Sequence, residues 1–373
     1  MKSLTRLLLV FFAFGCWTAM NPVFGTHQMG LDMTYECLSA CTYRIYVTTY
    51  YDCTGGAMNQ YLPLPGNPPP NPIADVNADF RIEGIGVGCT APTAIGGWTQ
   101  DANYGYIEVT QICPVAGGTG CTNGNSGING VVSVRWFQDY NFCATTCTEY
   151  RLVYDGCCRN GGITSGAAND GINSRQTIIN TALANCNTSP IFSNPPVPYL
   201  CAGQSFTFNQ GAFDADGDSL AYSLGTCFDD EPFGGGLPPP VGYNAGFSAL
   251  QPLGPGWNVS INAQTGDITM NPNPNGPQQV GVICVIVEEF RNGVKIGEIV
   301  RDMQITVINC GTTNTLPSIP AQFTNLSPAS ASANGLVIDA FACQELCFDI
   351  PVIDPDGTQN KIIFWNGGIP GGI

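Results

Sequence analysis

The sequence is poor in charged residues, and above all in positive charge. Charged side chains make up 11% of the 373 residues, well below the roughly 25% of an average globular protein. Lys and Arg number 12 against 28 Asp and Glu, so the formal net charge is −16. A chain of this sign repels phosphate backbones, and its natural partners are cations or basic surfaces. The composition therefore argues against nucleic-acid binding.

The residues and motifs of common enzymes are also scarce. His27 is the single histidine, so a Ser-His-Asp or Cys-His site would have to use it. No GxSxG, HExxH or Walker sequence occurs. Scattered Asp and Glu could form a glycosidase pair, but nothing in the sequence selects two of them. We expect no enzymatic activity, and a hydrolase with an unrecognised carboxylate pair is the alternative.

Long hydrophobic runs are missing after the N-terminus. Residues 7–14 form an apolar run behind Lys2 and Arg6 that is too short to span a bilayer. This pattern predicts a signal peptide over residues 1–25, the alternative being a lipoprotein signal that would acylate Cys16. No later run is long enough to cross a membrane. The sequence therefore predicts an exported chain without a transmembrane span, secreted or held at the cell surface as an outer-membrane-associated protein.

Cysteine, by contrast, is abundant, with 18 residues. In an exported chain most cysteines form disulfides, and the CxxxC pairs lack the tight spacing of zinc sites. We expect Cys227 and Cys284 to pair across the predicted β-sandwich at residues 191–312, because they lie on separate predicted strands. The adjacent Cys157 and Cys158 are each expected to bind a distant partner, because a bond between chain neighbours is strained.

Glycine and proline are frequent, at 46 and 28 residues, and short alternating segments lie between them. This pattern is typical of short strands joined by turns. The clearest pair is residues 280–290 and 294–308, which alternate on either side of Asn292-Gly293, a strong hairpin signal. The sequence predicts an all-β chain of tandem immunoglobulin-like or cadherin-like β-sandwich modules, braced by disulfides, with the last module truncated.

An acidic turn occurs twice and guides the predicted domain boundaries. Residues 213–224 combine the turn with an alternating strand, and residues 353–357 repeat it near the C-terminus. Proline-rich residues 191–200 are expected to form an interdomain linker. The predicted divisions are a signal peptide at 1–25, an N-terminal Cys-rich β domain at 26–190, a β-sandwich at 191–312 and the start of a further repeat at 313–373.

The first acidic turn is the main candidate site. Asp214, Asp216 and Asp218 alternate around Gly217. Calcium takes about six to eight oxygen ligands, so these carboxylates could supply half of a calcium site, with residues 229–231 or the next module completing it. The alternative is a plain turn in which the Asp side chains accept local backbone N–H groups.

Several short motifs lie within residues 26–310. They are Thr26-His27, Met33-Thr34-Tyr35-Glu36-Cys37, Tyr51-Asp52-Cys53-Thr54-Gly55, Cys157-Cys158-Arg159-Asn160, Pro196-Val197-Pro198-Tyr199-Leu200-Cys201-Ala202-Gly203-Gln204, Val287-Glu288-Glu289-Phe290-Arg291-Asn292-Gly293, Ile296-Gly297 and Arg301-Asp302. In this combination the chain is similar to large secreted surface proteins of Bacteroidetes, the gliding-motility-associated adhesins. The resemblance implies many immunoglobulin-like or cadherin-like repeats and export by type IX secretion. It also implies O-glycosylation at Ser219, where a sugar would compete with calcium.

Two non-enzymatic functions are compatible with these features. The favoured one is an extracellular or cell-surface adhesin or structural segment, stiffened by calcium, whose loops contact a glycan or protein ligand. The second is a carbohydrate-binding accessory region of a secreted polysaccharide-degrading enzyme. In that case Trp98, Tyr104, Tyr106 or Trp257 would stack on sugar rings, although each of these rings could equally belong to the core.

Overall fold

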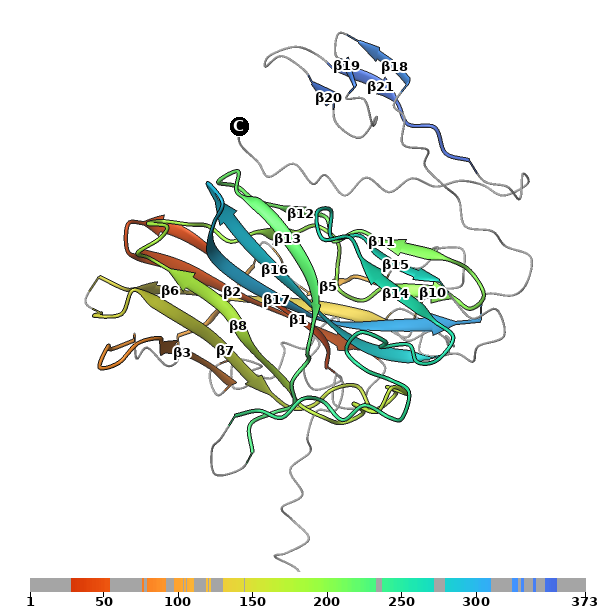
Figure 1. Ribbon diagram of the computed structural model, residues 1–373, viewed down its shortest axis with the longest axis horizontal. Helices are drawn as coiled ribbons and strands as arrows, with labels where there is room; N and C mark the ends of the chain where they lie inside the picture. The colour runs from red at the N-terminus through yellow and green to blue at the C-terminus, as the bar shows by residue number, and fades with distance from the viewer. Residues whose placement is uncertain are drawn as a thin grey trace, which may run out of the picture.

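The computed structural model describes residues 28–53, 79–91, 97–110, 130–232, 237–271 and 279–309, apart from residues 103, 105 and 144, together with residues 76, 119 and 121 and short pieces between 324 and 353. The secondary structure of this part of the chain is almost entirely β-strand (Figure 1). The prediction of an all-β, disulfide-braced fold is confirmed.

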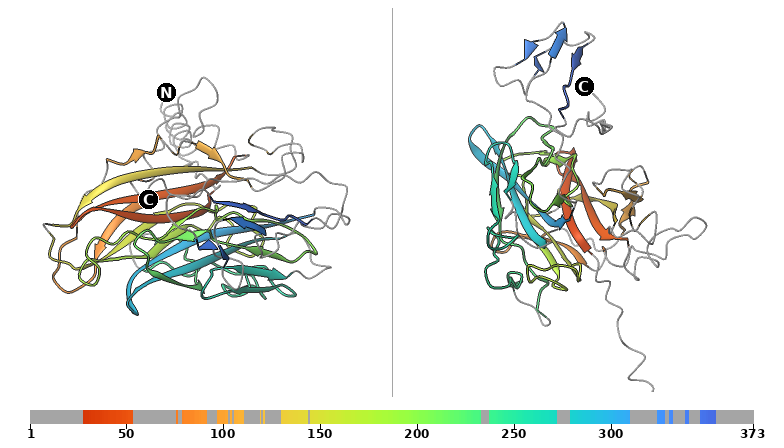
Figure 2. Two further views of the ribbon diagram at one scale, coloured as in Figure 1. Left: turned by 90° about the horizontal axis from the view of Figure 1, so that it is seen from above. Right: turned by 90° about the vertical axis from the view of Figure 1, so that its right-hand side faces the viewer.

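The largest sheet has 12 strands. Its main path runs β3-β7-β8-β17-β1-β2-β6-β4, while β5 pairs with β6, β10 and β16 pair with β17, and β13 pairs with β16. Figure 2 shows that the sheet is strongly curved, with β2 and β16 toward opposite sides. The strands are β1 (Gln28–Ser39), β2 (Thr42–Asp52), β3 (Phe80–Gly84), β4 (Thr99–Gln100), β5 (Tyr106–Glu108), β6 (Val131–Asn141), β7 (Glu149–Gly156), β8 (Ile172–Asn180), β10 (Tyr199–Cys201), β13 (Ser219–Gly225), β16 (Val280–Arg291) and β17 (Val294–Ile308).

A three-stranded sheet packs against the main sheet, in the order β11-β15-β14. Its residues Phe208, Ile268 and Met270 belong to the same buried cluster as Ile283 and Met303 of the main sheet. Alternating apolar residues on short strands therefore meet in one shared core. The strands are β11 (Phe206–Phe208), β14 (Asn258–Ile261) and β15 (Ile268–Asn271), and a further pair is β9 (Ile191–Phe192) with β12 (Ala212–Phe213).

Residues 26–190 and 191–312 do not form two separate sandwiches, contrary to the predicted division. β1 lies antiparallel to β17, with Leu31 opposite Asp302. β8 also pairs with β17, through Ile179 opposite Gly297. Alternation along a sequence indicates that a segment is a strand, but it does not say which strand lies beside it. The two ranges therefore share one sheet.

Residues 191–200 belong to this fold and do not form an interdomain linker. Ile191 and Phe192 form β9, and β10 runs parallel to the end of β17, with Leu200 opposite Val307. Val197 and Leu200 are fully buried. Proline limits backbone donors but does not stop a segment from packing along a strand edge, so the linker prediction is wrong.

Two buried ion pairs attach β17 to other parts of the chain. Arg301 binds Asp32 of β1 through two hydrogen bonds of 2.8 and 2.9 Å. The next residue, Asp302, binds Arg159 through bonds of 2.5 and 2.6 Å. Successive strand residues point to opposite faces, so the two pairs hold the two faces of β17. All four side chains are buried.

The C-terminal region is described only in short pieces. Two small ladders are present, and the second acidic turn at residues 354–357 lies outside the described residues. The predicted truncated repeat therefore stays a prediction. The ladders pair β18 (Thr324–Ser327) with β21 (Cys347–Asp349) and β19 (Ser330–Ala331) with β20 (Ile338–Asp339).

Candidate functional site

One end of the main sheet is held together by three disulfides. Strand register brings the connected segments to this end, because Thr42 at the start of β2 lies opposite Asn141, and Glu149 at the start of β7 lies opposite Asn180. We name residues 37–41, 85–89, 142–148, 181–188, 214–218 and 291–294 the braced end. The disulfides are Cys37–Cys186, Cys41–Cys143 and Cys89–Cys147.

The acidic turn belongs to the braced end because it leads directly into β13. The first residue of β13, Ser219, lies opposite Phe290 near the end of β16. Asp214 Oδ1 accepts the backbone N–H groups of Asp216 at 3.0 Å and Asp218 at 2.9 Å. Gly217 has φ of 81°, a conformation that favours glycine. These are the local hydrogen bonds of the plain-turn alternative.

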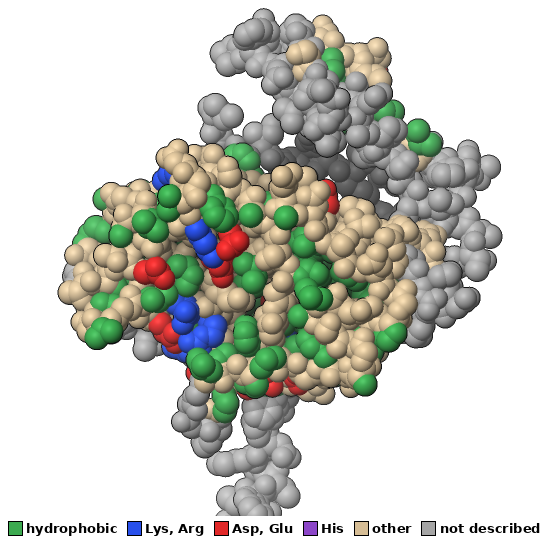
Figure 3. Space-filling model, in the orientation of Figure 1, with side chains coloured by type: hydrophobic (Ala, Val, Ile, Leu, Met, Phe, Trp, Pro, Cys, Tyr) green, Lys and Arg blue, Asp and Glu red, His purple; other side chains and the backbone are tan. Residues whose placement is uncertain are grey.

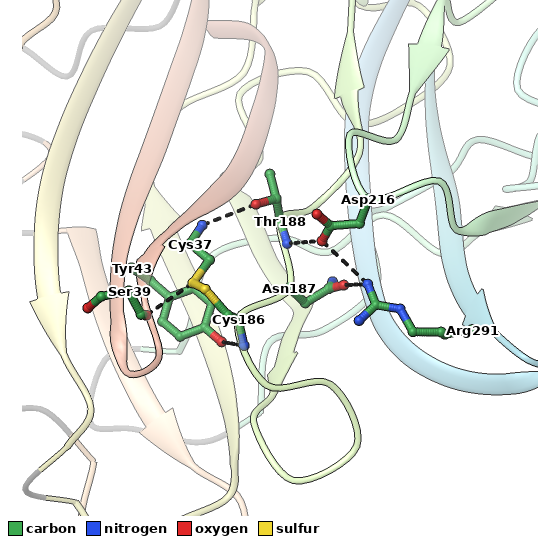
Figure 4. The surroundings of a disulfide bond; sticks show 8 residues. All are labelled: Cys37, Ser39, Tyr43, Cys186, Asn187, Thr188, Asp216 and Arg291. Atoms are coloured by element: carbon green, nitrogen blue, oxygen red, sulfur yellow. Dashed lines mark hydrogen bonds and ion pairs between the residues drawn. A yellow bond between two sulfur atoms is a disulfide. The ribbon is translucent and has the colours of Figure 1, made fainter. Parts of the chain in front are cut away.

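Arg291, at the end of β16, neutralises part of the turn. Its Nε donates to Asp218 Oδ1 at 2.8 Å and its Nη2 to Asp218 Oδ2 at 2.6 Å, a bidentate pair. The same Nη2 lies 3.4 Å from Asp216 Oδ2 and 2.8 Å from Asn187 Oδ1 (Figure 4). Hydrogen bonding to Asp218 is the main reason that the pKa of Arg291 is raised. The acidic turn therefore carries its own counter-ion.

The turn is connected to the Cys37–Cys186 disulfide through the loop after β8. Thr188 donates its backbone N–H to Asp216 Oδ2 at 2.8 Å, and its hydroxyl accepts the Cys37 N–H at 3.2 Å. The Cys186 N–H donates to the Tyr43 hydroxyl at 3.1 Å, as Figure 4 shows. Thr188 could not be predicted from the sequence, because this loop has neither alternation nor a recognisable motif.

Glu289 is fully buried beside the turn. Its Oε1 accepts a hydrogen bond of 2.8 Å from Asn187, and its carboxyl group also shares a side-chain hydrogen bond with Asp214. Oxygens of Asp214, Asp218 and Glu289 lie within 4.8 Å of one another. Burial raises the pKa of Glu289 to about 8; Asn187 opposes this shift and Asp214 adds to it. Burial also raises the pKa of Asp214.

Carboxylates that converge in this way could hold a cation, but most of their oxygens already accept hydrogen bonds from the protein. Arg291 binds both oxygens of Asp218 and one oxygen of Asp216, and backbone N–H groups bind Asp214 Oδ1. Calcium at the three predicted aspartates would therefore compete with Arg291 for the same oxygens. The predicted calcium site stays a prediction, and Glu289 is a candidate ligand that sequence reasoning did not select.

Exposed apolar side chains lie on the loops of the braced end. Leu38 near the end of β1 is 43% exposed, Leu183 in the loop after β8 is 55% exposed, and Val294 at the start of β17 is 51% exposed. Single exposed apolar residues are common on protein surfaces. Here Leu38 and Leu183 lie beside the two cysteines of the Cys37–Cys186 disulfide, which is an arrangement suited to contact with a partner.

The aromatic residues considered for sugar stacking have different surroundings. Trp98 and Trp257 are buried in the core. Tyr104 is half-buried and has the Arg135 guanidinium over its ring at 4.4 Å. The side chain of Tyr106 and the single histidine, His27, lie outside the described residues. No open aromatic platform is formed by the two tryptophans.

The remaining predicted cysteine and glycosylation sites can also be placed. Cys227 and Cys284 form the expected disulfide. Cys157 and Cys158 are bonded to each other, so the expectation of distant partners is wrong. The expectation took the strain of a bond between chain neighbours as decisive. The sequence alone does not show whether another cysteine lies close enough to compete. Ser219 is exposed, and its glycosylation stays a prediction.

The disulfides fit an extracellular protein, because such bonds persist in oxidising compartments. Within the part of the chain that the structure describes, there is no helix with the length and hydrophobicity of a membrane span.

Comparison with known proteins does not assign a family. No family model matches the chain, and no curated protein gives a significant match. One similar solved structure is a nucleoside hydrolase-related hypothetical protein from Saccharophagus degradans that is associated with carbohydrate metabolism. It is 14% identical over 33% of this chain and 26% of that chain, with a TM-score of 0.20. The chain therefore spans about a quarter of that protein's length.

Two further solved structures contain repeated β domains. The tandem Ig repeats of Dlar are 8% identical over 72% of this chain and 90% of that chain, with a TM-score of 0.18. The cadherin-like domains 1 to 4 of zebrafish RET are 10% identical over 74% of this chain and 47% of that chain, also with a TM-score of 0.18. These scores are too low to carry a functional conclusion.

Proposed function

We propose that this chain is a non-enzymatic binding and structural segment of an extracellular or cell-surface protein, an adhesin that contacts its ligand through the braced end. The observation that supports this proposal is the convergence of three disulfides on loops with exposed apolar side chains. Binding residues are often carried on loops that a rigid scaffold positions. Loops that are ordered before binding lose less conformational entropy when a partner docks.

The proposed ligand is an extracellular glycan or protein that offers an apolar contact. Leu38, Leu183 and Val294 would supply the apolar part of the interface. The net charge of −16 disfavours a strongly acidic protein partner, because long-range repulsion would slow its approach.

The test uses residues 26–373 as probe on an array of extracellular proteins and on a glycan array. The double variant Leu38→Asp with Leu183→Asp is expected to bind its ligand at least about tenfold more weakly than the unaltered chain, because both changes place charge in the apolar contact. The control is Leu250→Asp, in a loop next to Pro252 and Leu253, which lie against Gly281 at the far end of β16. Leu250 is 67% exposed, so this variant should bind normally.

Equal loss of binding in the control variant would place the contact outside the braced end and contradict the proposal. The non-enzymatic part has a separate test, in which the same chain is incubated with a panel of polysaccharides. Release of reducing sugar that disappears on substitution of a single Asp or Glu would show a hydrolase instead.

A further inference from the structure

A closed ring of ion pairs lies on β3, β8 and a neighbouring loop. Arg81 binds Glu83 at 2.9 Å and also binds Glu231. Arg175 binds Glu83 at 3.1 Å and Glu231 at 3.2 Å. Two guanidinium groups therefore alternate with two carboxylates, and the ring is neutral as a whole. In Figure 3 a mixed group of positive and negative side chains lies at the lower left, where Figure 1 places β7 and β8.

Arg151 of β7 stands beside this ring but is not part of it. Its single ion pair is a long one, 3.8 Å from Nη1 to Glu83 Oε2, and Glu83 is already bound by Arg81 and Arg175. No hydrogen bond from the Arg151 guanidinium to a described residue is formed, and its buried Nε lacks an acceptor. The side chain is 34% exposed.

This position differs from that of the other positive charges in the described residues. Apart from Lys2, Arg6 and Lys361, which lie outside that part of the chain, each other Lys and Arg has a carboxylate oxygen at 3.1 Å or closer. In a chain with 28 acidic residues, a guanidinium whose one ion pair is 3.8 Å long requires an explanation. A ligand anion would supply the acceptors that the protein does not.

Two further acidic residues near Arg151, Glu149 and Glu298, form no ion pair with it and bind other partners. Glu149, two residues earlier on β7, accepts a hydrogen bond of 3.0 Å from Asn180. Glu298, opposite Ile178 on the next strand, is bound by Lys295. Ile178 itself lies directly opposite Arg151 across the β7–β8 pair and is half-buried. An exposed guanidinium therefore sits beside an apolar side chain on an otherwise acidic protein.

We propose that Arg151, with Ile178 beside it, binds the carboxylate of an acidic sugar unit in an extracellular glycan. A planar carboxylate matches the fork of a guanidinium, and the C–H face of a sugar ring can pack on an aliphatic side chain. A single surplus positive charge suits a ligand with isolated carboxylates. A densely charged polyanion would be repelled by the net charge of −16. This inference rests on the proposed binding function and adds a ligand class to it.

The experiment follows the arginine Nε–H signals of residues 26–373, labelled with ¹⁵N, during titration with methyl glucuronide. We expect the Arg151 signal, assigned from its loss in Arg151→Gln, to shift with the glucuronide and not with neutral methyl glucoside. Arg151→Gln should weaken binding by about tenfold or more, because a charge-assisted hydrogen bond is lost. Arg151→Lys should retain part of the affinity, since it keeps the charge without the fork.

The matched control is Arg44→Gln. Arg44 is also about a third exposed, but it already binds Asp139 through bonds of 2.7 and 2.9 Å, so this variant should bind the glucuronide normally. Thermal unfolding of each variant checks that it is folded. Equal weakening in the control, or an Arg151 signal that no glucuronide concentration moves, would overturn the proposal.

Two further probes separate the sources of the anion. A sulfated methyl glucoside or a peptide with a free C-terminal carboxylate that shifts the Arg151 signal at lower concentration than the glucuronide would overturn the sugar-carboxylate assignment. If the glucuronide fails while Leu38→Asp with Leu183→Asp still abolishes ligand binding, the proposed adhesin function stands and the Arg151 site does not.

Discussion

Two Arg–Asp ion pairs of this protein, Arg301–Asp32 and Arg291–Asp218, lie in contrasting surroundings. In the middle of the main sheet, Arg301 and Asp32 are buried, and Arg301 donates two hydrogen bonds to the Asp32 carboxylate. At the braced end, Arg291 makes an equally close bidentate pair with Asp218, whose side chain is buried like that of Asp32, but the arginine side chain is 34% exposed. The chemistry is the same, and the access of water differs. Burial of both partners makes the first pair a requirement of the fold, whereas the partly exposed arginine of the second pair can give way to a competing cation.

The largest effect should come from breaking the buried pair. Arg301→Gln leaves the Asp32 carboxylate without its counter-ion inside the protein, which typically costs about 3–5 kcal/mol of unfolding free energy. Urea unfolding measures the loss. The surface control is Arg44→Gln, whose pair with Asp139 is exposed and should be worth less than about 1 kcal/mol. If the single variant does not fold, the double variant Asp32→Asn with Arg301→Gln should recover part of the stability. Equal losses at Arg301 and Arg44 would contradict the comparison.

Local features of this fold could be predicted from the sequence. The β16–β17 hairpin follows from two alternating runs around Asn292-Gly293, and both turn residues have positive φ, 54° and 78°. The Cys227–Cys284 disulfide is also predictable from two cysteines of one β-rich region, although Cys227 lies just after β13 and not on a strand. The hairpin can be predicted because all of its information lies in one continuous stretch. The disulfide can be predicted because cysteines in an exported chain mostly pair with each other.

Long-range pairings could not be predicted in the same way. Arg301 and Asp302 are adjacent charges in a strand, a pattern typical of an exposed edge, yet both are buried because their partners arrive from β1 and from the segment after β7. The acidic turn shows the same limit. Its three aspartates suggested a cation site, but Arg291 is 73 residues from Asp218 and nothing local connects them. Non-local pairing is decided by packing of the whole sheet.

The second effect concerns pH and the buried carboxyl group next to the turn. The pKa of Glu289 is raised to about 8 from an ordinary value of 4.5, so between these values the folded chain holds a proton that the unfolded chain releases. The contribution of Glu289 to the free energy of unfolding is therefore fully present below about pH 4.5. It falls as pH rises toward 8, by up to about 1.4 kcal/mol per pH unit. Glu289→Gln should remove this slope. Unfolding at several pH values measures it.

The adjacent residue provides the control for this pH dependence. Glu288 points to the opposite face of β16 and binds Lys295 at 2.5 Å, partly exposed. Glu288→Gln should therefore keep the slope of the unaltered chain. A slope that persists in Glu289→Gln would mean that another group holds the proton.

The smallest effect is expected at Arg291, and it bears on calcium. Arg291→Gln removes the counter-ion of Asp218 and Asp216. The Asp218 side chain is only 4% exposed, but the guanidinium is partly exposed, so the loss should be about 1–3 kcal/mol, less than at Arg301. The same change frees the carboxylate oxygens that calcium would need. We therefore expect calcium to raise the melting temperature of Arg291→Gln more than that of the unaltered chain, measured by calorimetry with magnesium as the control ion.

If calcium stabilises neither protein, the acidic turn is a hydrogen-bonded turn whose cation is the arginine itself. If it stabilises both equally, the ion binds elsewhere, because only a site at the turn would compete with Arg291.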